Sequence, residues 1–160
     1  MSIEDRFRDV MRRYPTGVTV VTSYIADKPH GLTVNSFTSI SIKPPLVGIF
    51  ITTGSTGYKA IKETGAYAVN ILKHDQEVIA RRFAEEPPNK RFENLRWYRT
   101  RSLGLPAIDG SLAYIEARVV GESDIADHTL FIGEVVDAEI LIDSEPLIYY
   151  MRGYRKILKI

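Results

Sequence analysis

The sequence predicts a mostly β protein that forms a closed or partly closed antiparallel barrel with a few short peripheral helices. Short runs rich in β-branched and aromatic residues, about seven in number, are each bounded by Gly, Pro, Asp or Lys. Few segments show apolar residues at helical spacing. Helices and strands do not alternate as a doubly wound parallel sheet requires, and neither G-x-G-x-x-G nor G-x-x-x-x-G-K-S/T is present.

The first predicted element is a helix that begins after Ser2 and ends before Pro15. Asp5 stands three residues after Ser2, as expected if Ser2 is the N-cap. Apolar residues recur on one side of this segment at helical spacing: Ile3, Phe7, Val10, Met11 and Tyr14. Charged residues occupy the opposite side: Glu4, Asp5, Arg8, Asp9 and Arg12.

After Gly17 the apolar period changes from 3.6 to 2, which predicts strands. We expect four of them, at 17–25, 31–42, 46–52 and 66–72. A short helix between the last two ends at Gly65, because glycine is common where helices stop. A further helix is expected at 75–84, with Val78, Ile79 and Phe83 on one face.

The C-terminal part begins with a long polar segment at 85–110, which we expect to be a lid or binding loop. Alternation then returns. Ala113, Ile115, Ala117 and Val119 are expected on one face of a strand, and Tyr114, Glu116 and Arg118 on the other. A long strand at 128–143 contains a bulge at Gly133, and 146–151 is the last strand.

The composition describes one ordinary domain spanning residues 1–160, with 44% hydrophobic and 26% charged residues. A formal net charge of +1 disfavours nucleic acid or an anionic membrane as the main partner. The absence of cysteine excludes disulfides and thiolate chemistry, and the three dispersed histidines predict no metal site. With no signal peptide and no membrane span expected, we predict a cytoplasmic protein.

Two segments offer dense hydrogen-bonding groups. TVNSFTS at 33–39 carries four hydroxyls and one amide, along which a planar heteroaromatic ring could lie; a solvated edge strand is the alternative. TGSTG at 53–57 joins a strand to a helix, so Ser55 and Thr56 would favour an anion at the helix N-terminus, with Lys59 adding charge. Its alternative is a simple helix cap.

Three further features carry weaker signals. Arg91 and Phe92 combine a phosphate-binding group with an aromatic surface, or are a surface arginine beside a packed ring. His128 stands at the head of a strand, and the basic segment 152–155 is either a phosphate site or a tail. No G-x-S-x-G elbow is present, and Glu85 and Glu86 are interpreted as part of a solvated loop, so no catalytic constellation is predicted.

The chain resembles the flavin reductase family with the FMN-binding split-barrel fold, from about Tyr14 to Arg155. It is particularly similar to the reductase components of two-component aromatic monooxygenases, such as 4-hydroxyphenylacetate 3-monooxygenase. The resemblance rests on RYPTGVTVVT, HGLTVNSFTSISIKPPLVGIFI, AYAVNIL, RF, DHTLFIGEVVD and PLIYYMRGYRK, in this order. It implies a homodimer of six-stranded split barrels with flavin near the subunit boundary.

The resemblance also implies the binding residues. Those along the flavin ring would be Thr33, Val34, Asn35, Ser36 and Ser39. Those at its ribityl chain and phosphate would be Thr53, Ser55, Thr56 and Lys59, with Arg91 and Phe92. Those at the nicotinamide nucleotide would be His128, Arg152 and Tyr154.

The function that the resemblance implies is hydride transfer from NADH or NADPH to FMN or FAD, with reduced flavin passed to a partner oxygenase. The sequence shows no pair of arginines suited to the extra phosphate of NADPH, which favours NADH. Such a reaction needs no protein acid, base or nucleophile, because the cofactors carry the reactivity. The alternatives are a non-enzymatic flavin- or haem-binding split barrel and an interaction domain that binds no ligand.

Overall fold

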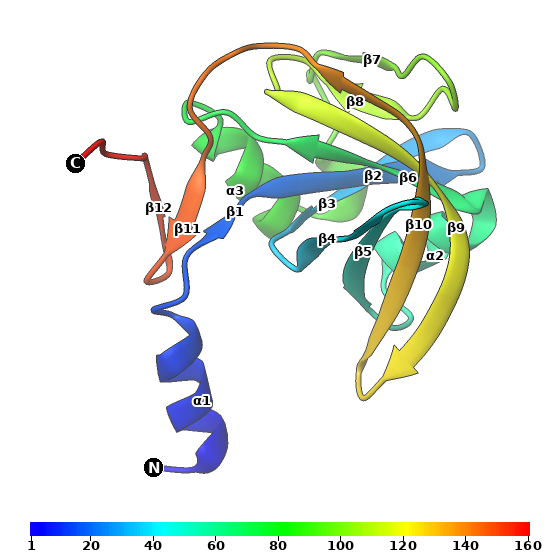
Figure 1. Cartoon of the computed structure of the whole chain (residues 1–160). Coiled ribbons are helices and arrows are strands. Elements are labelled where there is room, and N and C mark those ends of the chain that lie inside the picture. Colours follow the sequence, from blue (N-terminus) through cyan, green and yellow to red (C-terminus); the bar gives the residue numbers. More distant parts are fainter.

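Antiparallel strands are the main secondary structure of the protein, in a computed structural model that describes residues 1–160 (Figure 1). The helices are α1 (Ile3–Met11), α2 (Thr56–Thr64), α3 (Glu77–Glu85) and the single 3₁₀ turn η1 (Pro88–Lys90). The first six strands are β1 (Thr16–Gly17), β2 (Thr19–Ile25), β3 (Lys28–Val34), β4 (Phe37–Ile42), β5 (Pro45–Thr52) and β6 (Ala66–Ile71). The other six are β7 (Trp97–Arg99), β8 (Pro106–Ile108), β9 (Ala113–Ile125), β10 (His128–Ile140), β11 (Ile148–Tyr150) and β12 (Gly153–Arg155).

Seven of these strands form one sheet in the order β3-β2-β6-β9-β10-β5-β4. Its end strands, β3 and β4, share no ladder, so the sheet is not a closed barrel. Of the two expected forms, closed and partly closed, the closed one is wrong. Two smaller sheets complete the fold, β1-β11-β12 and β7-β8. The last predicted strand therefore leaves the main sheet and pairs with β1 near the N-terminus.

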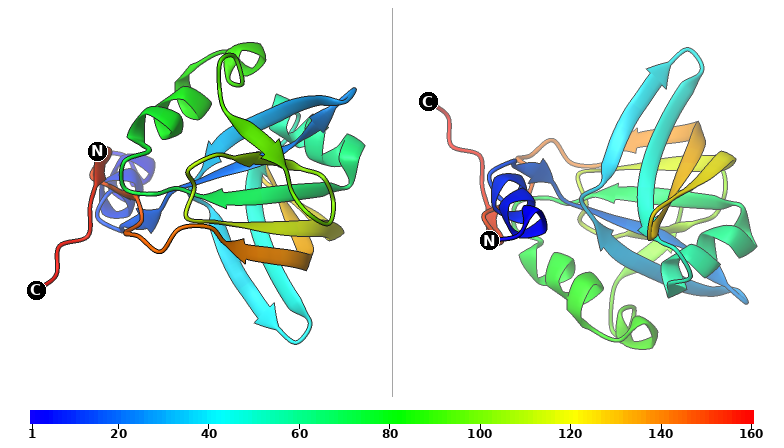
Figure 2. Two further views of the ribbon diagram at one scale, coloured as in Figure 1. Left: turned by 90° about the horizontal axis from the view of Figure 1, so that it is seen from above. Right: turned by 90° about the horizontal axis from the view of Figure 1, so that it is seen from below.

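The predicted strand at 31–42 is broken in two at Asn35 and Ser36, which we call the Asn35–Ser36 corner. β3 pairs with β2 at one edge of the sheet, and β4 pairs with β5 at the other. Since two residues reach only about 7 Å, the sheet must curl until its two edges approach each other at this corner. Figure 2 shows the β4–β5 hairpin diverging from β3 beyond it.

The larger core cluster follows from that curl. Val34 of β3 and Ile49 of β5 lie in one buried cluster although their strands are at opposite ends of the sheet order. Tyr67, Phe131 and, from α2, Ile61 complete its centre. A second cluster forms where α3 covers β2 and β3, around the buried ring of Phe83. Val78 is 76% exposed, so the expected apolar face of α3 does not include it.

Local signals in the sequence are confirmed at three points. Ser2 caps α1 in a reciprocal capping box with Asp5. Gly65 ends α2 with a φ of 69°, in the left-handed region that favours glycine. The register of β9 and β10 shifts between Ile132 and Gly133. A Cβ at Gly133 would lie 2.5 Å from the Tyr67 hydroxyl, so only glycine fits this bulge.

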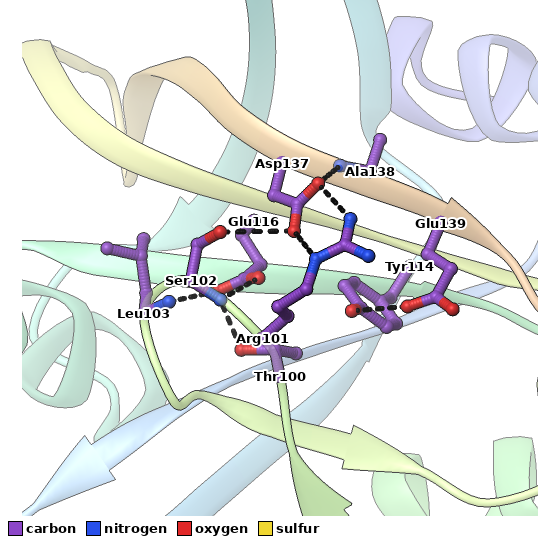
Figure 3. Close-up of polar contacts among 9 residues, drawn as sticks. All are labelled: Thr100, Arg101, Ser102, Leu103, Tyr114, Glu116, Asp137, Ala138 and Glu139. Carbon is purple, nitrogen blue, oxygen red and sulfur yellow. Dashed lines mark hydrogen bonds and ion pairs between the residues drawn. The ribbon is translucent and has the colours of Figure 1, made fainter.

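The segment 85–110 is more ordered than the predicted loop, because it contains η1 and the β7–β8 hairpin. It also covers Glu116, which the alternation placed on the face opposite Ala117 and which is fully buried, as is Tyr114. Figure 3 shows the Glu116 carboxylate accepting from the Thr100 hydroxyl at 2.6 Å and from the backbone N–H groups of Ser102 (3.0 Å) and Leu103 (2.5 Å). We call this group of contacts the Glu116 cluster.

Helix α1 projects from the strands at the end of the molecule where the C-terminus also lies (Figures 1 and 2). None of its residues is buried. Its base is tied to the β11–β12 turn, since the Met151 N–H donates to the Arg12 carbonyl at 2.9 Å. None of the helices is both long and apolar enough to cross a membrane.

Candidate functional site

A hollow of about 560 Å³, which we call the first hollow, opens beside the Asn35–Ser36 corner. The corner and the neighbouring strands β4 and β5 line it through Asn35, Ser36, Phe37 and Phe50. Tyr14, which follows α1, lines the other side. The hollow therefore combines aromatic surface with the main chain of the corner.

The backbone N–H groups of Asn35 and Ser36 have no partner within the chain. They fall between two ladders, because Val34 is the last residue paired with β2 and Phe37 the first paired with β5. The Ser36 hydroxyl donates to the Phe50 carbonyl at 2.9 Å, which fixes the corner against β5. Two donors are thus held rigidly at the edge of a hollow and are free for a ligand.

The second polar segment, TGSTG at 53–57, lies near the same corner. Phe50 is followed within three residues by Thr53, and the Cα of Gly57 lies so close to Leu32 of β3 that a Cβ there would meet it at 2.8 Å. Ser55 caps α2 by accepting from the Tyr58 N–H at 3.2 Å. The cap leaves the N–H groups of Gly54 and Thr56 without partners. The segment is therefore a helix cap that also leaves donors free for an anion.

Other predicted flavin contacts have structural partners of their own. The Thr33 hydroxyl donates to the Ala80 carbonyl at 2.6 Å, and Val34 belongs to the larger core cluster. Ser39 is exposed on β4 opposite Val47, beyond the residues that line the first hollow. The Thr53 hydroxyl shares a hydrogen bond of 2.8 Å with the Thr129 hydroxyl. The side chains of these residues are therefore less available than the main chain of the corner.

Arg91 and Phe92 fasten the 85–110 segment to the body. Arg91 donates from Nε to the Glu86 carbonyl and from a terminal nitrogen to the Gly31 carbonyl, both at 2.9 Å. Phe92 packs edge-to-face on Phe83, with ring centroids 5.0 Å apart. Because Gly31 precedes Leu32, this anchor holds the guanidinium close to the strand that contacts the α2 N-terminus.

A second hollow, of about 290 Å³, adjoins the first at Asn35, which lines both. Besides Asn35 and Thr33, it contains two of the residues predicted at the nicotinamide nucleotide, Arg152 and Tyr154. Arg81 and Glu85 of α3, which were not predicted as binding residues, line it as well. The Arg81 guanidinium lies 5.1 Å from the centre of the Tyr154 ring, and the Tyr149 ring lies 5.4 Å from it. Burial raises the pKa of Tyr154, so its phenol stays neutral at physiological pH.

Arg81 was missed because a charged helix face is ordinarily solvated, and nothing in the sequence indicates that β11 and β12 pack beside it. The interpretation of Glu85 as part of a solvated loop is wrong, since Glu85 is the last residue of α3 and lines the second hollow. Arg152, from the same region, adopts a left-handed backbone with a φ of 58° in the tight turn between these strands. Such a conformation costs non-glycine residues about 1 kcal/mol or more, which the surrounding contacts must offset.

His128 lies elsewhere. It pairs with Thr52 of β5 and contacts Asp127, with 2.8 Å between Nδ1 and the carboxylate. The Asp127 carbonyl in turn accepts from the Thr53 N–H at 3.0 Å. Within one chain, His128 therefore stands beside the TGSTG segment and not in the hollow that contains Arg152. No group of three or more His, Asp or Glu side chains is arranged to hold a metal ion.

The donor set suits a flavin. Free N–H groups at the corner match the carbonyl oxygens of a flat ring, and those at the α2 N-terminus match a phosphate. The two sets lie on adjoining parts of the chain, because Thr53 stands only three residues after Phe50, which the Ser36 hydroxyl contacts, or about 10 Å along a strand.

Comparison with known proteins agrees with this chemistry. The family model for the flavin reductase like domain matches residues 11–158. The reductase subunit HsaB of a flavin-dependent monooxygenase from Mycobacterium tuberculosis is 36% identical over 153 residues, which cover 94% of this chain and 81% of that protein. The FMN reductase (NADH) SmoA of Agrobacterium fabrum is 38% identical over 143 residues, covering 89% of this chain and 80% of that protein.

A solved structure extends the likeness to three dimensions. The NADH:FAD oxidoreductase SgcE6 of Streptomyces globisporus C-1027, in complex with NAD and FAD fragments, matches with a TM-score of 0.90 and 33% identity. The match covers 98% of this chain and 93% of that one.

Proposed function

Because the chain belongs to the flavin reductase like domain family, we propose that it is an NADH-dependent flavin reductase that supplies reduced flavin to a partner oxygenase. The observation that carries the proposal is the Asn35–Ser36 corner, where two unpaired backbone N–H groups belong to residues that line the first hollow. The flavin is FMN or FAD, since relatives of both kinds match.

The residues of this chain bind and orient the two ring systems. The N–H groups of Asn35 and Ser36 would donate to the ring carbonyls, and those of Gly54 and Thr56 to the phosphate. Arg91 and Lys59 add positive charge near the phosphate, while Arg152 and Tyr154 would meet the nicotinamide nucleotide. His128, beside the TGSTG segment, would contact a nucleotide only where it extends towards α2.

Hydride acceptance is the chemistry that flavin supplies when bound. The protein needs no acid or base for that step, which agrees with the lack of a catalytic constellation. Holding donor and acceptor in contact contributes several kcal/mol, of the order of 7, through pre-organisation. The N–H groups of the corner would also stabilise negative charge that develops on the ring, because they fall between two ladders and have no partner within the chain.

We also propose the finer architecture. A split barrel is supported by the curled sheet, whose edges meet only at the Asn35–Ser36 corner. A homodimer is supported by α1, since Ile3, Phe7 and Val10 are 65%, 62% and 66% exposed along one face of a helix that buries nothing. Use of NADH supports the cytoplasm as its compartment.

The direct test is to mix the purified protein with NADH and FMN or FAD in air and to follow the nicotinamide absorbance. We expect NADH oxidation that depends on both protein and added flavin. Flavin binding without oxidation of NADH or NADPH would contradict the proposal and favour a flavin carrier. A protein that binds no flavin would favour an interaction domain.

A further inference from the structure

We propose that Glu85, at the end of α3, makes the protein prefer NADH over NADPH because it faces the adenosine ribose of the bound nucleotide. This inference rests on the proposed function and names a specificity residue for it. The sequence offered no residue that distinguishes the two nucleotides. The second hollow, which brings together α3 and the β11–β12 turn, supplies one.

The position of the second hollow indicates which half of the nucleotide it takes. The nicotinamide ring must stack on the flavin ring, which we place at the Asn35–Ser36 corner. Asn35 lines both hollows, so a dinucleotide with its nicotinamide at the corner would extend its adenosine half into the second one. Tyr149 and Tyr154 form an aromatic wall there, and Arg152, which has no ion-pair partner, is available to the pyrophosphate.

The arginines in the second hollow are not equally available. Arg81 lies 2.9 Å from the Glu77 carboxylate and 3.5 Å from that of Glu85, and its remaining contact is the face of Tyr154. Its fork is therefore occupied on both sides by carboxylates of its own helix. A 2′-phosphate would have to displace these carboxylates to gain a bidentate contact with Arg81.

Glu85 has the opposite character. Its side chain is 66% exposed, and only one long contact, to Arg81, engages it. A carboxylate at this place accepts hydrogen bonds from the ribose 2′-hydroxyl of NADH and repels the 2′-phosphate of NADPH. Because the carboxylate is exposed, solvent moderates both effects, and the preference should weaken as salt is added.

The test compares Glu85→Gln with Glu86→Gln. Glu86 is the next residue and is exposed, but it does not line the second hollow, so it controls for the loss of one charge at the end of α3. We expect Glu85→Gln to raise kcat/KM for NADPH about fivefold and to change that for NADH less than twofold or so. Glu86→Gln should leave the ratio as in the wild type.

A binding measurement separates this inference from the proposed function. In calorimetry, Glu85→Gln should tighten adenosine 2′,5′-bisphosphate about fivefold relative to 5′-AMP, and the gain should shrink at high salt. If the wild type oxidises NADH but Glu85→Gln and Glu86→Gln show the same nucleotide ratios, the inference is wrong and the function stands. If the binding ratios change as expected but no flavin is reduced, the function is wrong and the role of Glu85 stands.

Discussion

The Asn35–Ser36 corner and the Glu116 cluster handle polar groups in opposite ways. At the cluster, a buried carboxylate accepts three hydrogen bonds, and Arg101 clamps Asp137 with two contacts of 2.8 and 2.9 Å (Figure 3). At the corner, two backbone donors beside a hollow have no partner. The difference separates polar groups that hold the fold together from those that the fold keeps for a ligand.

The energetics of the two regions explain the difference. A buried polar group without a hydrogen-bond partner destabilises the fold by about 1 to 3 kcal/mol. The Glu116 carboxylate, which is buried, therefore has its hydrogen bonds satisfied within the protein. The corner faces an open hollow, where water satisfies the donors until a ligand replaces it. Backbone donors without a protein partner therefore cost little stability at the corner, where water or a ligand can reach them.

The largest effect should come from Glu116→Ala. It leaves the Thr100 hydroxyl and the Ser102 and Leu103 N–H groups without their acceptor, and we expect a loss of about 3 kcal/mol in the free energy of unfolding. Denaturant titration measures it. Glu134→Ala, at an exposed position of β10, should cost less than about 0.5 kcal/mol. Equal losses in the two variants would contradict the anchoring role of the cluster.

At the ligand side of the comparison, Ser55→Ala combined with Thr56→Ala should weaken flavin binding about tenfold, because the α2 N-terminus loses its cap and two hydroxyls. Titration with FMN measures it. Ser2→Ala is the matched control, since Ser2 caps α1 in the same way but lies far from the first hollow. If the double variant binds FMN as tightly as Ser2→Ala does, the placement of the phosphate at the α2 N-terminus is wrong.

The nucleotide contacts should show a smaller effect. We expect Arg152→Gln to raise KM for NADH about fivefold, since it removes the unpaired cation of the second hollow. Arg155→Gln, three residues on and outside the hollow, should leave KM unchanged. His128→Gln should raise KM less than Arg152→Gln. The reverse order would mean that the nucleotide lies along the β9–β10 turn.

The smallest effect concerns pH. The hydrogen bond from Arg101 lowers the pKa of Asp137 below its ordinary value of 3.8. A carboxyl group whose pKa is lower in the folded state than in the unfolded state stabilises the fold at pH values above its ordinary pKa. This contribution is lost as the pH falls through the folded-state pKa. Arg101→Gln should therefore reduce stability at about pH 7 but not at about pH 2. An equal loss at both pH values would assign the effect to packing.

The sequence predicted elements well where the signal was local. The Ser2 cap, the stop at Gly65 and the bulge at Gly133 all follow from one residue and its neighbours. It could not reveal the break at the Asn35–Ser36 corner, because residues 31–42 keep their strand-like character and only the curl of the sheet separates the two halves. Nor could it show that Glu116 is buried, since the segment that covers it is remote and reads as polar.

The site divides in the same way. The polar segments at 33–39 and 53–57 were recognisable because their chemistry is local, although the structure transfers the donor role from side chains to the main chain of the corner. Arg81 and Glu85 depended on which elements pack beside α3, a contact between parts of the chain about 70 residues apart in sequence.

A crystal structure of the protein with FMN tests the central claim most directly. We predict that a ring carbonyl lies within hydrogen-bond distance of the Asn35 or Ser36 N–H and that the phosphate meets the N–H groups that precede α2. Density for the flavin away from both segments would contradict the account.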